Sequence, residues 1–116
     1  MNTDEIARAF SGHRFEETFD FIAPDAVWHL VGQAQLEGRE AIVANCRGTT
    51  EETAAETAWL RFVSTGAGSI VAVDAIGRYR GPEGVSVVSS CDIYEFANGA
   101  ITAITSYAVD LPHEPK

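Results

Sequence analysis

The sequence predicts an α+β domain in which helices pack on one face of an antiparallel sheet. Helical patterns fill the first half of the chain, and from Thr57 onward the pattern changes to strands separated by turn signals. Helices first and hairpin-linked strands afterwards are typical of α+β folds. The 116 residues, 46% of them hydrophobic, are enough for one core. We therefore expect a single domain over residues 1–116, with its core between about residues 3 and 111.

Two helices are expected before the first strand. Thr3, followed by two acids, starts a helix because its hydroxyl caps the first amides and the acids favour the helix dipole. This helix should stop near Gly12. Residues 13–23 predict a second, amphipathic helix ended by Pro24. Its apolar side chains recur at helical spacing and are Phe15, Phe19 and Ile22.

A short strand and a third helix complete the first half. Residues 26–31 predict a strand with alternating faces. One face carries Val27, His29 and Val31, and the other carries Trp28 and Leu30. Residues 38 to about 55 predict the third helix. Its outer face is acidic, which is typical of a solvated surface, at Glu51, Glu52 and Glu56.

The second half predicts a four-stranded antiparallel meander. Its strands are residues 58–65, 69–80, 85–96 and 100–109, separated by Gly66-Ala67-Gly68, Gly81-Pro82-Glu83-Gly84 and Asn98-Gly99. In the third of these strands both faces are apolar, with Val88, Tyr94 and Phe96 on one and Val85, Val87, Cys91 and Ile93 on the other. One layer of helices covers only one face, so the second apolar face predicts a homodimer. The alternative is that the long strands curl around their own core.

Composition excludes several classes of partner. Seventeen acids against eight basic residues give a formal charge of -9, which would repel nucleic acid and anionic membranes. No apolar run approaches the ~20 residues that span a bilayer, and the first residues lack a signal-peptide pattern, so we expect a cytoplasmic protein. Cys46 and Cys91, and the three histidines His13, His29 and His113, lack metal-ligand spacing. Because no Gly-rich phosphate loop precedes a helix either, we expect no metal and no cofactor.

Two polar residues interrupt apolar strand faces and are the candidate catalytic residues, His29 and Asp92. If both face inward, an imidazole and a carboxyl enter a cavity between helices and sheet. His29 would act as general base, and Asp92 would orient it or, if neutral, donate a hydrogen bond to an oxyanion. The alternative is a buried pair that only satisfies itself. We expect the cavity to be lined by Phe19, Val27, Val31, Val88, Ser90, Tyr94, Ile104 and Ala108.

Other polar residues admit two interpretations each. Asp74 and Arg78 share a strand face, with Arg80 beyond them, and form either a link lining the cavity or a surface ion pair. The strand tyrosines are either hydroxyl donors or packing residues. They are Tyr79, Tyr94 and Tyr107.

Three segments together resemble the nuclear transport factor 2-like superfamily, and within it the SnoaL-like branch. They are residues 21–29 (FIAPDAVWH), 37–42 (EGREAI) and 91–101 (CDIYEFANGAI), and the resemblance runs from about Ile6 to Leu111. It implies a cone-shaped, cystatin-like fold with N-terminal helices on a curved antiparallel sheet. Because the superfamily includes isomerases, cyclases, hydrolases, dehydratases and binding proteins, the resemblance alone selects no activity.

Particular positions refine what the resemblance implies. His29 is similar in place to the carboxylate base of ketosteroid isomerase, Asp92 to its acidic oxyanion donor, and Ile6 replaces its tyrosine, which argues against steroid isomerisation. Ser90 stands where limonene epoxide hydrolases carry an Arg. The polyketide cyclases of the branch use an acid and a base around an apolar ligand. We therefore expect a cofactor-independent enzyme that acts by acid/base chemistry, of the isomerase, cyclase or hydrolase type, on a small apolar metabolite bearing a carbonyl or hydroxyl. The alternative is a non-catalytic small-molecule-binding module or a dimeric interaction domain.

Overall fold

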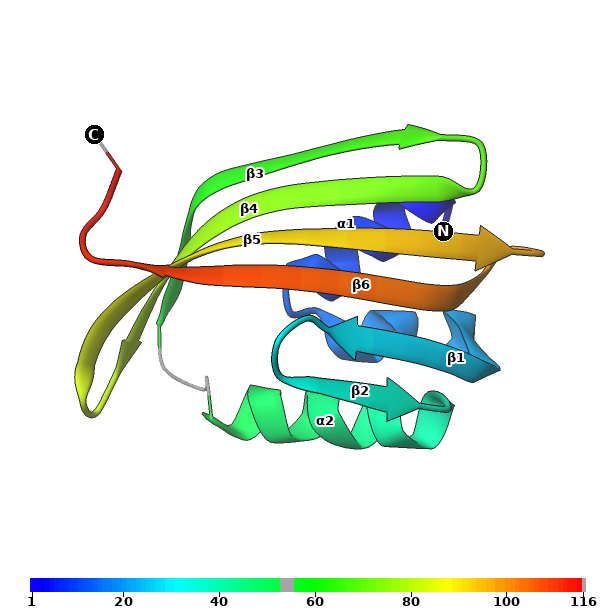
Figure 1. The fold of residues 1–116 in the computed structure, drawn as a ribbon, viewed down its shortest axis with the longest axis horizontal. Helices are drawn as coiled ribbons and strands as arrows, with labels where there is room; N and C mark the ends of the chain where they lie inside the picture. Colours follow the sequence, from blue (N-terminus) through cyan, green and yellow to red (C-terminus); the bar gives the residue numbers. More distant parts are fainter. Residues whose placement is uncertain (53–55, 116) are drawn as a thin grey trace.

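The fold is a six-stranded sheet with helices on one face and along one edge (Figure 1). The computed structural model describes residues 1–52 and 56–115, with the side chains of 50–52 left out. In chain order the elements are α1 (Thr3–Ser11), the 3-10 helix η1 (Phe15–Phe21), β1 (Ile22–Leu30), β2 (Ala34–Glu37), α2 (Arg39–Glu52), β3 (Thr57–Ala67), β4 (Ile70–Gly81), β5 (Gly84–Ala97) and β6 (Ala100–Leu111). The predicted α+β class is confirmed.

The predicted four-stranded meander is also confirmed, as β3 to β6. The sheet order is β2-β1-β6-β5-β4-β3, and all neighbouring pairs are antiparallel except β1 and β6, which are parallel. The ends of these strands differ from the predicted ones by no more than two residues. Helix α1 packs on β3, β4 and β5, so one face of the meander is covered and becomes the inner face.

Helix α1 begins one residue earlier than predicted. Asn2, and not Thr3, is the N-cap: its side chain accepts from the Glu5 amide, and the Glu5 carboxylate accepts from the Asn2 amide. The helix ends at Gly12, as expected. Its inward side chains Ile6 and Phe10 are almost fully buried in the core.

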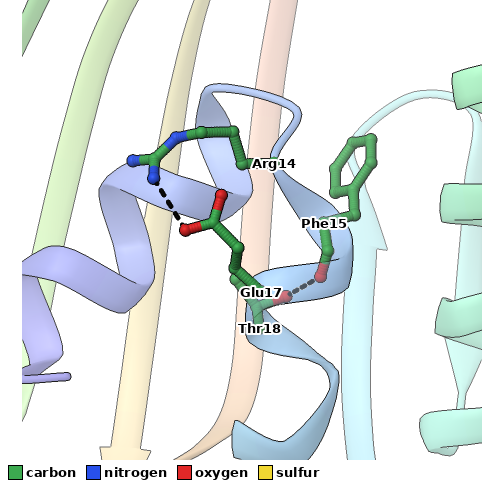
Figure 2. Close-up of polar contacts among 4 residues, drawn as sticks. All are labelled: Arg14, Phe15, Glu17 and Thr18. Carbon is green, nitrogen blue, oxygen red and sulfur yellow. Dashed lines mark hydrogen bonds and ion pairs between the residues drawn. The ribbon is translucent and has the colours of Figure 1, made fainter.

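The predicted second α-helix over residues 13–23 is wrong. The structure has a shorter 3-10 helix, η1, held by the Thr18 hydroxyl, which donates to the Phe15 carbonyl at 2.6 Å, and by the Arg14–Glu17 ion pair at 3.0 Å (Figure 2). Pro24 does not end a helix but lies within β1. The strand tolerates it because the β1–β6 pairing is irregular between Ile22 and Val27, where a missing amide costs no ladder bond.

Strand β2 was not predicted, and it precedes α2. Its four residues alternate apolar and polar side chains, but the run is short and mostly exposed, so the pattern is too weak to predict a strand. The predicted helix end near Ala55 and the side chains of Glu51 and Glu52 lie outside the described residues, whereas Glu56 is exposed. Within the described ranges no helix is long and apolar enough to cross a bilayer. A cytoplasmic location stays a prediction.

Candidate functional site

A cavity of about 320 Å³ opens between the helices and the inner face of the sheet. Its walls come from the end of α1, from η1, α2 and the turn after β1, and from strands β1, β4, β5 and β6. The lining residues are Phe10, Ser11, His13, Phe15, Trp28, Leu30, Gln33, Asn45, Thr49, Tyr79, Val88, Ser90, Asp92, Ser106, Tyr107 and Ala108. Half of these residues are aromatic or aliphatic and the others are polar, so the cavity combines apolar walls with hydrogen-bonding groups, as small-molecule sites do.

Asp92 is the acid of this cavity, and serine hydroxyls hold its carboxyl. The Ser11 hydroxyl donates to Asp92 Oδ2 at 2.8 Å. The Ser11 oxygen is also 2.6 Å from the Tyr94 hydroxyl, which is fully buried. Since Ser11 has only one hydroxyl hydrogen, Tyr94 donates to Ser11 whenever Ser11 donates to Asp92. The result is a hydrogen-bonded chain that ends on the carboxyl.

A second chain approaches Asp92 from β1 and β6. Trp28 Nε1 donates to the Ser106 hydroxyl oxygen at 2.8 Å. Ser106 is directly across the β5–β6 ladder from Asp92 and hydrogen-bonds its carboxyl, which works to lower the carboxyl's pKa. The Ser106 oxygen therefore accepts a hydrogen bond from the Trp28 indole, and the Ser106 hydroxyl hydrogen is donated to Asp92.

Burial is the largest influence on this carboxyl and raises the pKa of Asp92. The hydrogen bonds of Ser106 and Ser11, and then the charge interaction with His13, oppose the shift. Asp92 therefore exchanges its proton closer to neutral pH than a solvated aspartate does. A carboxyl poised in this way is suited to general acid/base work.

His13 is the imidazole of the cavity. It has a positive φ of 64°, and this left-handed conformation turns the chain from α1 into η1. Its ring stacks between Phe15, at 5.2 Å, and Tyr79, at 5.8 Å. Burial lowers the pKa of His13, while the nearby Asp92 charge raises it. The imidazole is therefore held mainly neutral at pH 7, the form that accepts a proton.

Tyr79 is the third polar side chain of this site, after Asp92 and His13. Its ring occupies the space that Gly77 on β4 leaves open. Gly77 and Tyr79 share the inner face, and a Cβ added at Gly77 would lie 2.7 Å from the Tyr79 hydroxyl oxygen and 3.0 Å from the Trp59 ring. The Tyr79 ring therefore lies back over Gly77. Burial, and next the charge of Asp92, raise the pKa of Tyr79, so its hydroxyl stays protonated and can donate a hydrogen bond.

The structure does not form the predicted His29–Asp92 pair. His29 pairs with Thr105, which pairs with Ile93, whereas Asp92 pairs with Ser106, which pairs with Leu30. Partners across a ladder share a face and neighbours along a strand alternate, so His29 is on the outer face and Asp92 on the inner face. The inward side chains of β1 are Trp28 and Leu30, and the expectation of an inward His29 was wrong.

The other predicted lining residues divide in the same way. Val88, Ser90 and Ala108 line the cavity together with Asp92. The remaining five do not: Val27 is on the outer face of β1 with His29, Val31 is exposed in the turn after β1, Tyr94 and Ile104 are fully buried in the core, and Phe19 packs against that core from η1. The core contains Tyr94 and Ile104, with Phe19 packed against it, because helices α1 and α2 cover the inner face of the sheet.

His13 and Ser11 are site residues that sequence reasoning missed. Ser11 is the last residue of α1 and His13 lies in the turn after it, and no alternation marks this segment, which approaches Asp92 about eighty positions later in the chain. Tyr79 was considered as a hydroxyl donor, and its position beside the cavity agrees with that interpretation. Tyr94 serves both as packing residue and as donor to Ser11.

Asp74 and Arg78 do not line the cavity and do not pair with each other. Asp74 binds Arg61 at 2.9 Å, and Arg78 binds Glu114 at 2.7 Å, both as half-exposed pairs on the outer side of β4. Of the two cysteines, Cys46 is fully buried, which raises the pKa of its thiol to about 12, and Cys91 is half-buried. Across the described ranges, no three His, Cys, Asp or Glu side chains are grouped as metal ligands would be.

The SnoaL-like domain model matches residues 4–104. The chain belongs to the SnoaL-like domain family. A comparison with curated proteins finds no match. Among solved structures, the chain is similar to an NTF2-like protein of unknown function from Cytophaga hutchinsonii, with 25% identity, 90% of this chain and 94% of the other covered, and a TM-score of 0.79.

Two further solved structures, at lower identity, show the fold alone. One is a candidate SnoaL-like polyketide cyclase from Shewanella putrefaciens, with 13% identity, 90% of this chain and 75% of the other covered, and a TM-score of 0.72. The other is an LEH-like epoxide hydrolase from M. tuberculosis, with 18% identity, 87% and 74% covered, and a TM-score of 0.67. The cone-shaped, cystatin-like architecture expected from the sequence is confirmed.

Proposed function

We propose that this SnoaL-like protein is a cofactor-independent enzyme that performs acid/base chemistry on a small apolar metabolite bearing a carbonyl or hydroxyl group. The observation that carries the proposal is the Asp92 carboxyl, held by Ser11 inside an aromatic-walled cavity beside His13. Polar groups kept in an apolar cavity cost stability, and proteins retain them most often for function. The base assigned to His29 from the sequence passes to His13.

The roles follow from the two pKa directions. Neutral His13 accepts a proton from the carbon or hydroxyl that reacts. Asp92 in its protonated form, with the Tyr79 hydroxyl, donates hydrogen bonds to the oxygen on which negative charge develops. The imidazolium then returns its proton to the product, so each group ends in its starting state. The Tyr94–Ser11 chain supports the carboxyl when it is charged.

Proton exchange gives a test that needs no knowledge of the natural substrate. We expect the protein to accelerate exchange of the acidic C–H hydrogens of 2-tetralone for deuterium in D2O, followed by NMR. His13→Gln should reduce the rate about 10²- to 10⁴-fold, the usual contribution of a general base. His113→Gln, in the exposed tail, is the matched control. Absence of exchange by the parent protein across a panel of such ketones would count against catalysis.

The cavity also supports the second candidate, a non-catalytic binding module for a small apolar molecule. Aromatic walls bind such a ligand whether or not a reaction follows. Saturable binding of 2-tetralone, with no exchange beyond the solvent rate and with the His13→Gln variant indistinguishable from the parent, would favour this candidate.

We further propose that the protein is a homodimer joined through the outer face of the sheet. The helices leave that face uncovered, and several of its apolar side chains are exposed, among them Val63 at 44% and Val109 at 61%. Val87 was predicted to contribute to this interface but is already buried within the chain. The proposal therefore rests on Cys91 and Ile93 together with Val63 and Val109. A dimer would bury about 1,200–2,000 Å². Sedimentation should give a dimer that Val109→Asp dissociates; a 12.5 kDa monomer at micromolar concentration would refute it.

A further inference from the structure

The polar side chains that line the cavity include two sets that come from different elements. One set, from α1, β5 and β6, is Ser11, Asp92 and Ser106. The other, from α2 and the turn after β1, is Gln33, Asn45 and Thr49. In the sheet order β1 is two strands from β5, which corresponds to about 10 Å. Helix α2 packs on β1 and β2, and Figure 1 shows it along the β2 edge of the sheet, away from β5, which carries Asp92.

The second set offers neutral hydrogen-bonding groups. The side-chain amides of Asn45 and Gln33 each supply N–H donors and a carbonyl acceptor. Within the described part of the chain, neither amide has a hydrogen bond to another residue. Thr49 is turned back to its own helix, where its hydroxyl donates to the Asn45 backbone carbonyl at 3.1 Å. The two amides are therefore available to a ligand.

Charge on the cavity wall limits what the ligand can carry. The described lining residues include no Lys or Arg, and the acid among them is Asp92. The whole chain has a formal charge of -9. A carboxylate or phosphate in this cavity would lose its hydration without gaining a counter-ion, which is unfavourable. The ligand is therefore neutral.

The walls between the two polar sets are aromatic. The ring centroid of Phe10 is 5.0 Å from that of Phe15 and 5.1 Å from that of Trp28, both edge to face, and Tyr79 also lines the cavity. Ring faces and edges of this kind pack best against another flat ring system. The volume of about 320 Å³ is at the small end of the usual range of ~300–1,000 Å³ for ligand pockets, which favours one or two fused rings.

We propose that the site takes a neutral, planar ligand of one or two rings with a polar group at each end. The first group binds at Asp92, and the second binds at the amides of Asn45 and Gln33. This substrate class rests on the proposed function only in assigning the reacting group to the Asp92 end. Binding of the second group by the amides is independent of any reaction.

Titration calorimetry with three related probes tests the proposal. They are naphthalene-2,6-diol with two neutral polar ends, 2-naphthol with one, and 6-hydroxy-2-naphthoate with an anionic end. We expect the diol to bind about 3- to 10-fold tighter than 2-naphthol, the contribution of one net hydrogen bond. The naphthoate should bind at least about tenfold more weakly than 2-naphthol. A naphthoate that binds as tightly as 2-naphthol, or a diol with no advantage, would overturn the proposal.

Variants locate the second polar end. Asn45→Leu should abolish the advantage of the diol while leaving 2-naphthol affinity within about twofold. Gln33→Ala, in an exposed turn, gives the same test at a position where folding is not at risk. Gln35→Leu removes an amide from β2 outside the cavity and should change neither affinity. Survival of the diol advantage in both Asn45→Leu and Gln33→Ala would refute the assignment.

The binding and exchange experiments fail in different ways. If the diol preference holds and 2-tetralone exchange is absent, the ligand class stands and catalysis is refuted. If exchange occurs and depends on His13 while the diol has no advantage, catalysis stands and the two-ended ligand is refuted.

Discussion

Asp92 and Asp74 are on neighbouring strands and have opposite surroundings. Asp92 pairs with Val73 across the β4–β5 ladder, and Asp74 pairs with Cys91, so the two acids are one register position apart. The Asp92 carboxyl faces the cavity and is held by Ser11. The Asp74 carboxyl faces outward, where it binds Arg61 at 2.9 Å with about half of each side chain exposed. One step of strand alternation separates a candidate catalytic acid from a surface ion pair.

The difference shows how the two faces of one sheet use the same side chain. On the outer face water solvates both partners, so the Arg61–Asp74 pair contributes about 0–1 kcal/mol. On the inner face burial favours the neutral carboxyl, and the protein offsets that cost with hydroxyl donors. The inner acid is therefore the one whose protonation is coupled to its environment.

Exchange activity should separate the two acids most strongly. Asp92→Asn is expected to reduce the rate of 2-tetralone exchange by about 10²- to 10³-fold, because an amide is a weaker hydrogen-bond donor to the developing oxyanion than a protonated carboxyl. Asp74→Asn, the matched control on the outer face, should stay within about twofold. Equal losses in the two variants would remove the functional distinction between the faces.

Packing around Tyr79 should have the next largest effect. Gly77→Ala introduces a Cβ that collides with the Tyr79 ring, so we expect about 1–3 kcal/mol of destabilisation and a lower exchange rate as Tyr79 and His13 shift. Gly81→Ala is the control, because no atom lies within 4 Å of its added Cβ. Denaturant unfolding of both variants measures the difference. If Gly77→Ala proves as stable as Gly81→Ala, the packing of the Tyr79 ring does not require the space at Gly77.

The pH dependence of stability sharpens the comparison. Burial raises the pKa of folded Asp92, so its contribution to the free energy of unfolding is fully present below the unfolded pKa of 3.8 and is lost as pH rises through the folded value. Asp92→Asn removes this loss and should gain stability relative to the parent as pH rises from 4 to 8. Urea unfolding at several pH values measures it. A stability difference that is constant with pH would contradict the direction of the shift.

His13 gives the free energy of unfolding the opposite dependence on pH, and a separate variant tests this contribution. Burial lowers its folded pKa, so its contribution is present above pH 6.5, the unfolded value, and is lost as pH falls through the folded one. His13→Gln should therefore flatten the acid side of the stability curve, and His113→Gln should leave the parent curve unchanged. The same urea series distinguishes them.

The smallest effect is expected on the outer face. Arg61→Ala should cost no more than about 1 kcal/mol, and less in 1 M salt than in 0.05 M salt, because the Arg61–Asp74 pair is solvated. Thermal melts at the two salt concentrations measure this. The measurement is made in the Val109→Asp background, where the outer face has no partner subunit, and a loss of several kcal/mol there would contradict a solvated pair.

Local patterns in the sequence determined the meander and the side of β5 that carries Asp92. The turns at Gly81–Gly84 and Asn98–Gly99 bound strands whose alternation puts Asp92 on the face of Tyr94 and Phe96, and the structure has that arrangement. Turn residues and strand alternation depend on neighbouring residues only, so they can be read without knowing the fold.

Tertiary structure decided the face of β1 and the partner of Asp92. Both faces of β1 are apolar enough to be buried, and its parallel register with β6 selected Trp28 over His29 for the inside. The same long-range packing turned residues 15–21 into a 3-10 helix and brought His13 to Asp92. These choices depend on contacts between distant segments, whose energies no local pattern of residues contains.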